Sequence, residues 1–189
     1  MEVYVKKLLV GSMLFAVLCT NICAAGNWQA VPGSSSAGWI EQLSQAHWIA
    51  AGARATNRVV YVFSDPNCPY CNDLWKALQV KRAADVQLRY LLVAVIDDDS
   101  RAKDAAILES QDPVATFDAQ ERSYASGGIP GKASIQPATA KTIAANELLM
   151  SALHIYGTPG LIYLDEHNQV RLFVGMPDDK QLQMIVGKR

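Results

Sequence analysis

The stretch Cys68-Pro69-Tyr70-Cys71 holds the residues best suited to chemistry in this chain of 189 residues. The chain has four cysteines, and the other two, Cys19 and Cys23, lie in its first 25 residues. Two cysteines separated by two residues, where an apolar strand meets a helix, can close a small disulfide ring that gives and takes electrons. The spacing therefore predicts a redox-active pair that needs no bound cofactor, because the two sulfurs are themselves the redox centre.

The helix expected after the motif assigns different roles to the two sulfurs. Pro69 suits the first turn of a helix, so Cys68 would stand exposed at the helix start. Free backbone N–H groups and the helix dipole favour a thiolate there, which makes Cys68 the candidate nucleophile. Cys71, one turn further and more buried, would attack the mixed disulfide and release the partner.

Two alternatives for the pair stay open. It could form an inert structural disulfide, or it could hold a metal, although two thiols supply only half of a tetrahedral zinc site. None of the histidines, His47, His154 and His167, has a spacing that completes such a site. The formal net charge is −1, and the sequence has no basic stripe of the kind that neutralises phosphates. Nucleic acid is therefore not an expected partner.

The pair must be positioned by an alternation of strands and helices. Residues 58–63 (Arg-Val-Val-Tyr-Val-Phe) are almost all β-branched or aromatic, which predicts a strand covered on both faces. Apolar residues at three- and four-residue steps predict an earlier helix over 39–53, and Cys68 would be followed by a helix that continues to Val80. A second apolar strand is expected over 86–95.

The second half of the chain predicts a helical segment and then a closing hairpin. Residues 96–154 are rich in alanine and read as largely helical, with a loop around Gly127–Gly131. Two short strands, 161–164 and 170–174, flank a turn, and a last helix begins at Asp178. The order is that of an α/β chain with a thioredoxin-like fold interrupted by a helical insertion at about 97–154, in a domain over 39–189.

The first 25 residues have the layout of a signal peptide. Lys6 and Lys7 precede an apolar run from Leu8 to Cys19, and small residues end at Ala25. The run is short for a membrane span, so we expect cleavage after Ala25 rather than an uncleaved anchor. Residues 26–38 then form a flexible lead. In an oxidising compartment the cysteine pair would stay a disulfide unless a partner keeps it reduced, so export alone leaves the working redox form open.

Residues 39–189 resemble the catalytic portion of the periplasmic thiol:disulfide interchange proteins of the DsbG and DsbC family, and DsbG more closely. The Cys-Pro-Tyr-Cys tetrad alone is a weak signal, because glutaredoxins also use it. Its combination with the helical insertion, a Thr-Pro loop and a C-terminal Gly-x-Pro-Asp is more specific. The residues that carry the resemblance are Tyr61–Cys71, Val86–Arg89, Leu91–Val93, Ala105–Leu108, Asp112-Pro113, Asn146-Glu147, Leu149-Met150, Thr158-Pro159 and Val174–Asp178.

The resemblance implies further site residues. Thr158-Pro159 would form a cis peptide bond beside the sulfurs, with the Thr158 hydroxyl tuning the Cys68 thiolate and its backbone holding an extended client strand. Glu147 matches the acid next to the DsbG thiol and would donate a proton to hydroxide leaving a sulfenic acid. The alternative for Glu147 is a solvated helix carboxylate.

The resemblance also implies partners. Cys68 would attack disulfides or sulfenic acids in oxidised or misfolded periplasmic proteins, and a membrane thiol reductase of the DsbD type would supply electrons. The dimerisation domain of the family has no counterpart here, where only the end of its linker helix is found at residues 38–48, so we expect a monomer. Two rival functions are a disulfide-forming oxidase like DsbA and a non-catalytic module that binds copper or unfolded clients.

Overall fold

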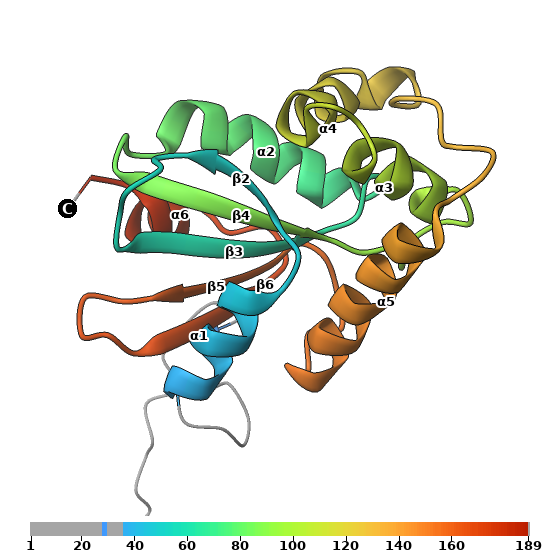
Figure 1. Ribbon diagram of the computed structural model, residues 1–189. Coiled ribbons are helices and arrows are strands. Elements are labelled where there is room, and N and C mark those ends of the chain that lie inside the picture. Colours follow the sequence, from blue (N-terminus) through green and yellow to red (C-terminus); the bar gives the residue numbers. More distant parts are fainter. Residues whose placement is uncertain (1–27, 30–35, 189) are drawn as a thin grey trace, which may run out of the picture.

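The computed structural model describes residues 28–29 and 36–188 of the chain (Figure 1). The predicted signal peptide, residues 1–25, lies outside these residues. Within the described part of the chain, no helix is long and apolar enough to cross a membrane.

A six-stranded mixed sheet forms the centre of the fold (Figure 1). Its strand order is β1-β6-β5-β3-β4-β2, in which β3 and β4 are parallel and the other neighbours are antiparallel. The prediction that residues 58–63 form a central strand is confirmed, because β3 pairs on both sides. The strands are β1 Trp28–Gln29, β2 Ile49–Gly52, β3 Arg58–Ser64, β4 Val86–Leu92, β5 Gly160–Leu164 and β6 Val170–Val174.

Helices cover both faces of the sheet, as the apolar character of β3 requires. Helix α2 (Pro69–Lys81) and helix α6 (Asp179–Val186) lie on one face, and α1 (Ser36–Gln45) and α5 (Pro137–Ala152) contribute to the core on the other. Side chains alternate along a strand, so Val60 and Val62 join the first core while Tyr61 and Phe63 join the second. Each side of β3 is therefore buried, which explains why its sequence shows no polar alternation.

The helical insertion lies between β4 and β5, where the sequence predicted it. It comprises α3 (Ser100–Leu108), α4 (Pro113–Arg122), the short 3-10 helix η1 (Tyr124–Ser126) and α5. The start of helix α4 is capped, because the Asp112 side chain accepts from the backbone N–H of Ala115 at 3.0 Å. Figure 1 shows α3 and α4 gathered at the end of the sheet where α2 begins.

The predicted helix over 39–53 is wrong in its second half. Helix α1 ends at Gln45, and residues 49–52 form the edge strand β2 instead. The sequence Ile-Ala-Ala-Gly has little intrinsic strand preference, but antiparallel pairing with β4 satisfies its backbone groups. Within the lead predicted over 26–38, residues 28–29 pair with β6 and α1 begins at Ser36, while residues 26–27 and 30–35 lie outside the described residues.

The strand predicted over 86–95 ends at Leu92. The N–H of Val93 still bonds the carbonyl of Ser64 at 3.1 Å, and the chain then turns because Val95 and Ile96 donate to the Asp65 carboxylate. The closing hairpin and last helix are confirmed. Asp178 caps α6 with a reciprocal pair of hydrogen bonds to Gln181.

Candidate active site

Cys68 occupies the N-cap position of α2, directly before Pro69, as the sequence predicted. Its carbonyl accepts the first helical hydrogen bonds, from Cys71 at 3.1 Å and Asn72 at 3.2 Å. The expectation that Cys68 is exposed is wrong, since only 2% of its surface and 4% of that of Cys71 is accessible. The reason is the Thr158-Pro159 loop, which lies against the Cys68 sulfur.

The surroundings of Cys68 favour its thiolate. A hydrogen bond from the Cys71 thiol is the largest influence and outweighs burial, so that the pKa of Cys68 falls to about 6. The Thr158 side chain and the backbone N–H groups of Cys71 and Tyr70 lower the pKa further. Hydrogen bonds and free N–H groups at a helix start stabilise negative charge, so Cys68 is the ionised sulfur of the pair.

Cys71 has the opposite electrostatic character. Burial raises its pKa well above the ordinary value, and its interaction with the Cys68 sulfur raises it further. Burial is the largest influence on the pKa of Cys71 but only the second on that of Cys68. The predicted order of a reactive first sulfur and a protonated second one is therefore what these environments favour.

The Thr158–Pro159 peptide bond is cis, as expected. In the thiol form the Cys68 Sγ donates to the Thr158 carbonyl at 3.3 Å. The buried Thr158 hydroxyl has no hydrogen-bond partner among the described residues, so it is available to a thiolate at Cys68. The loop is tied to the end of β6 by a 2.8 Å hydrogen bond from the Gly175 N–H to the Pro159 carbonyl.

Asp65 holds the loop that leads to Cys68. Its fully buried carboxylate accepts from the backbone N–H of Asn67 at 2.8 Å and from the Ser100 hydroxyl at 2.8 Å. It also accepts from the N–H groups of Val95 at 2.7 Å and Ile96 at 2.9 Å. One side chain thus fixes the segments that follow β3 and β4 and the start of α3.

The insertion contacts the active loop through residues that sequence reasoning missed. The Gln120 amide donates to the Pro66 carbonyl at 2.7 Å, and the Tyr124 hydroxyl donates to the Asn67 carbonyl at 3.0 Å. Glu121 is buried and accepts from the Asn72 side chain at 2.8 Å. The sequence carries a signal for two of these residues. Gln120 and Glu121 lie three and four residues after the buried Phe117, which places them on the same, inward-facing side of the helix.

Glu147 lies on α5, and its hydrogen bonds go to groups other than Cys68. Its carboxylate receives two bonds from Arg101, at 2.7 and 2.9 Å, and one from the Ala94 N–H at 3.2 Å. The Arg101 guanidinium therefore engages both carboxylate oxygens of Glu147. The role of Glu147 as a proton donor to leaving hydroxide stays a prediction, and the Arg101 pair weighs against it.

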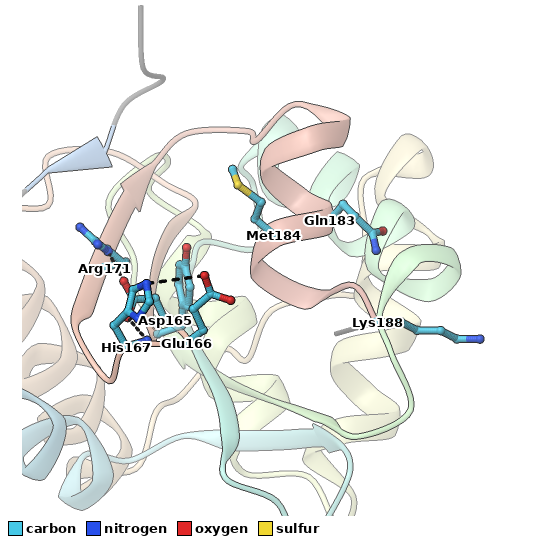
Figure 2. A pocket seen from close by; sticks show the side chains of 8 residues that line it. Asp165, Glu166, His167, Arg171, Gln183, Met184 and Lys188 are labelled. Carbon is cyan, nitrogen blue, oxygen red and sulfur yellow. Dashed lines mark hydrogen bonds and ion pairs between the residues drawn. The ribbon is translucent and has the colours of Figure 1, made fainter. Parts of the chain in front are cut away.

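A hollow of about 810 Å³ lies between the β5–β6 turn and α6 (Figure 2). Figure 2 shows Asp165, His167 and Arg171 on the hairpin side and Met184 on the helix side. This hollow is at the opposite end of the sheet from Cys68, because Phe63 at the active end pairs with Gly160 and the hairpin turn follows Leu164. Across the described part of the chain, no three His, Cys, Asp or Glu side chains are grouped to hold a metal.

A cysteine pair at the start of the first central helix, faced by a cis proline that precedes a closing hairpin, defines a thioredoxin-like protein. Residues 46–188 match the family model described as the thioredoxin-like domain. The chain belongs to this thioredoxin-like family.

Two curated relatives are similar to the chain over most of its length. It is 38% identical over 150 residues to the thiol:disulfide interchange protein DsbG of Pseudomonas aeruginosa, covering 79% of this chain and 59% of that protein. It is 37% identical over 150 residues to DsbG of Escherichia coli K12, covering 79% and 60% respectively. The chain thus spans about three fifths of the length of these relatives.

The fold is shared with a periplasmic thioredoxin-like protein from Salmonella enterica serovar Typhimurium. The two superpose with a TM-score of 0.65 at 20% identity, over 82% of this chain and 97% of the other. The fold class predicted from the sequence is confirmed by this likeness and by the family match.

Proposed function

We propose that the protein is a periplasmic thiol:disulfide oxidoreductase of the DsbG and DsbC type, exported by a cleaved signal peptide. The observation that carries the proposal is the position of the Cys68 sulfur, at the start of α2 and against the Thr158 carbonyl, with Cys71 buried one turn further along the helix. The relatives named DsbG and the periplasmic source of the Salmonella protein support both the activity and the compartment.

The proposed reaction begins with the Cys68 thiolate. It attacks a client sulfur in a disulfide or a sulfenic acid, forming a mixed disulfide and releasing a thiolate or, with one proton, water. Cys71, once deprotonated, then attacks the Cys68 sulfur. The Cys68–Cys71 disulfide forms, the client leaves as a thiolate, and two electrons have passed from the pair to the client.

Apolar side chains around the sulfurs support oxidised or misfolded proteins as clients. Tyr70 lies within the cysteine motif, Tyr156 shortly precedes the Thr158 loop, and Met176 follows the Gly175 that binds this loop. All three are exposed, Tyr156 to 80%. An apolar rim of this kind suits an extended client segment, whose backbone could pair with that of Thr158.

The proposal includes a source of electrons, because each turnover leaves the pair oxidised. A membrane thiol reductase of the DsbD type would return two electrons to Cys68–Cys71. The proposal also includes a monomer in solution, which light scattering tests. Glu147 would protonate the leaving hydroxide, and Glu147→Gln should then slow reduction of sulfenic acids more than reduction of disulfides.

One observation favours the reverse direction, a disulfide-forming oxidase like DsbA. A lowered pKa of Cys68 stabilises the reduced form of the pair, and a stabilised reduced form makes the disulfide a stronger oxidant. The redox state of the pair in living cells separates the two directions. A reductase should be mostly reduced and should become oxidised when the membrane reductase is deleted, whereas an oxidase is oxidised in both strains.

The activity itself is tested with purified protein and a client that carries one sulfenylated cysteine. Wild type should reduce the client, Cys71→Ser should accumulate the mixed disulfide, and Cys68→Ser should do neither. Stoichiometric copper binding by Cys68 and Cys71 without thiol exchange would show a binding module instead and would overturn the proposal.

A further inference from the structure

Asn67 is the residue directly before Cys68, and the steps proposed above do not use it. Both of its backbone polar groups are bonded. The N–H donates to the Asp65 carboxylate at 2.8 Å, and the carbonyl accepts from the Tyr124 hydroxyl at 3.0 Å. The side chain of Asn67 bonds to a third part of the protein, the start of α3. Asn67 is therefore held both by the end of β3 and by two parts of the insertion.

The side-chain amide of Asn67 lies within an ion pair of α3. Its oxygen accepts from the Lys103 ammonium at 2.7 Å, and its nitrogen donates to the Asp99 carboxylate and, at 3.0 Å, to the Ser100 hydroxyl. Lys103 and Asp99 also pair with each other at 3.0 Å. An amide suits this position because it presents an acceptor to the cation and a donor to the anion. A carboxylate at position 67 would instead face that of Asp99.

The burial of Lys103 makes this contact stronger than a surface ion pair. Only 7% of the Lys103 surface is accessible, and a buried ammonium group is costly unless it is paired and hydrogen-bonded. Asp99 and the Asn67 oxygen supply these partners. The Lys103 hydrogen bond holds the pKa of Asp99 below its ordinary value, and the Asn67 amide acts in the same direction. Asp99 is therefore a carboxylate near neutral pH and keeps its place in the contact.

The direction of the Cys68 side chain depends on the residues on either side of it. As the N-cap of α2, Cys68 has an extended backbone with φ −81° and ψ 117°. Pro69 follows and restricts the backbone of the residue before it. With Asn67 fixed on the other side, the Cys68 sulfur is aimed at the Cys71 thiol and the Thr158 loop. These are the groups that, with the backbone N–H groups at the start of α2, lower the pKa of Cys68.

We propose that Asn67 is a positioning residue, through which helix α3 of the insertion holds the Cys68 sulfur where its thiolate is stabilised. The hydrogen bonds of Asn67 go to groups other than the two sulfurs, so it acts through the backbone of Cys68. The inference rests on the function proposed above, because the Cys68 thiolate is the nucleophile of the first step. The insertion thereby takes part in setting how readily the pair gives up electrons.

A titration of the reduced protein tests the role of Asn67. The ultraviolet absorbance of the thiolate, followed against pH, gives the midpoint for Cys68. Asn67→Ala should raise this midpoint by about one pH unit, or roughly tenfold in the equilibrium between thiol and thiolate. A less stable thiolate also makes the disulfide a weaker oxidant, so the equilibrium with glutathione at pH 7 should shift about fivefold towards the oxidised pair. A residue that only stabilises the fold would change the free energy of unfolding and leave both quantities as they are.

Two lysine variants provide a matched comparison. Lys103→Met removes one bond of the Asn67 amide but leaves the loop that carries Cys68 intact, and should raise the midpoint by less than Asn67→Ala. It also decides the matter if Asn67→Ala does not fold. Lys132→Met removes a lysine from another ion pair of the insertion, with Glu109, and should leave the midpoint unchanged. An unchanged midpoint in Asn67→Ala or Lys103→Met would overturn the proposal, as would an equal shift in Lys132→Met.

An exchange of charge tests whether the contact with α3 is what acts on Cys68. Asn67→Asp sets two carboxylates against each other and should raise the midpoint more than Asn67→Ala. When Asp99→Asn is added, the amide and the carboxylate have exchanged places, and position 67 still accepts from Lys103. The midpoint should then return part of the way to that of wild type. No recovery in the double variant would count against the proposal.

The titration also separates this inference from the proposed function. Glu121 and Tyr124 interact with Cys68 as well, but they are the same in every variant, so differences between variants come from the contact at position 67. Failure of wild type to reduce any disulfide or sulfenic acid would overturn the proposed function. The titration needs no client, and would still decide whether Asn67 positions Cys68.

Discussion

The two ends of the central sheet differ in how they use polar residues. At the end that carries Cys68, the polar groups of Asp65, Asn72 and Glu121 are buried and bonded across long sequence separations. At the other end, the β5–β6 turn beside the hollow of Figure 2 carries exposed charges that bond mainly to near neighbours in sequence. The hollow of Figure 2 lies at the end without the reactive cysteines, so the position of reactive sulfur is a better guide to function than the presence of a hollow.

The largest contrast between the two ends should be in thiol exchange. Cys68→Ser removes the nucleophile and should abolish exchange with a peptide disulfide. His167→Ala, at the edge of the hollow, should leave the rate within about twofold, because a surface substitution far from the site changes little. A large loss of exchange in His167→Ala would show that the two ends are functionally coupled.

The second contrast should be in stability. Asp65→Ala leaves the backbone N–H groups of Asn67, Val95 and Ile96 without their acceptor, and should lower the free energy of unfolding by about 3 kcal/mol or more. Asp165→Ala removes three hydrogen bonds, one fewer than Asp65→Ala, and at a partly exposed turn, so it should cost about 1 kcal/mol. Urea unfolding of the two variants measures both, and equal losses would contradict the difference between the ends.

A third, smaller effect should appear in the pH dependence of Cys68 alkylation. With the pKa of Cys68 lowered to about 6, the thiolate fraction rises as pH rises through that value and is nearly complete by about pH 8. The rate of alkylation by iodoacetamide should therefore level off in wild type well below the pH at which an ordinary thiol is ionised. The same rate is measured in Cys71→Ala. The variant lacks the Cys71 hydrogen bond, and its inflection should lie at higher pH.

The smallest effect should come from the Thr158 hydroxyl. Thr158→Val removes a group that lowers the pKa of Cys68 less strongly than the Cys71 thiol does. The alkylation inflection should therefore move upward by less than in Cys71→Ala. An inflection that does not move would show that the buried hydroxyl is not used by the thiolate.

The sequence predicts the elements whose patterns are local and clear. Residues 59–63 are apolar throughout because both faces of β3 are covered, and Pro69 marks the start of α2. The strand β2 could not be predicted in this way, because Ile49–Gly52 is extended only through its pairing with β4. The prediction of a helix there followed the three- and four-residue spacing of apolar residues, and the tertiary pairing with β4 overrode it.

The site residues that lie in short motifs could be predicted from the sequence. Those that the helical insertion brings to the site could not. Cys68, Cys71 and the cis bond at Thr158–Pro159 were expected from motif and resemblance. Glu121 meets Asn72, the residue after Cys71, only because α4 folds back against α2, at a separation of 49 residues. A helical pattern shows which face of α4 is buried but not what that face meets.

The pairing of β1 with β6 has a consequence for how the molecule is made. The first described strand of the chain takes its place at the sheet edge only after one of the last, Val170–Val174, is present. Contacts of such separation form late in folding, because the closure of a long loop must come first. Completion of the sheet therefore waits for nearly the whole polypeptide, and a ribosome-bound chain that still lacks β6 would carry an unfinished edge at β5.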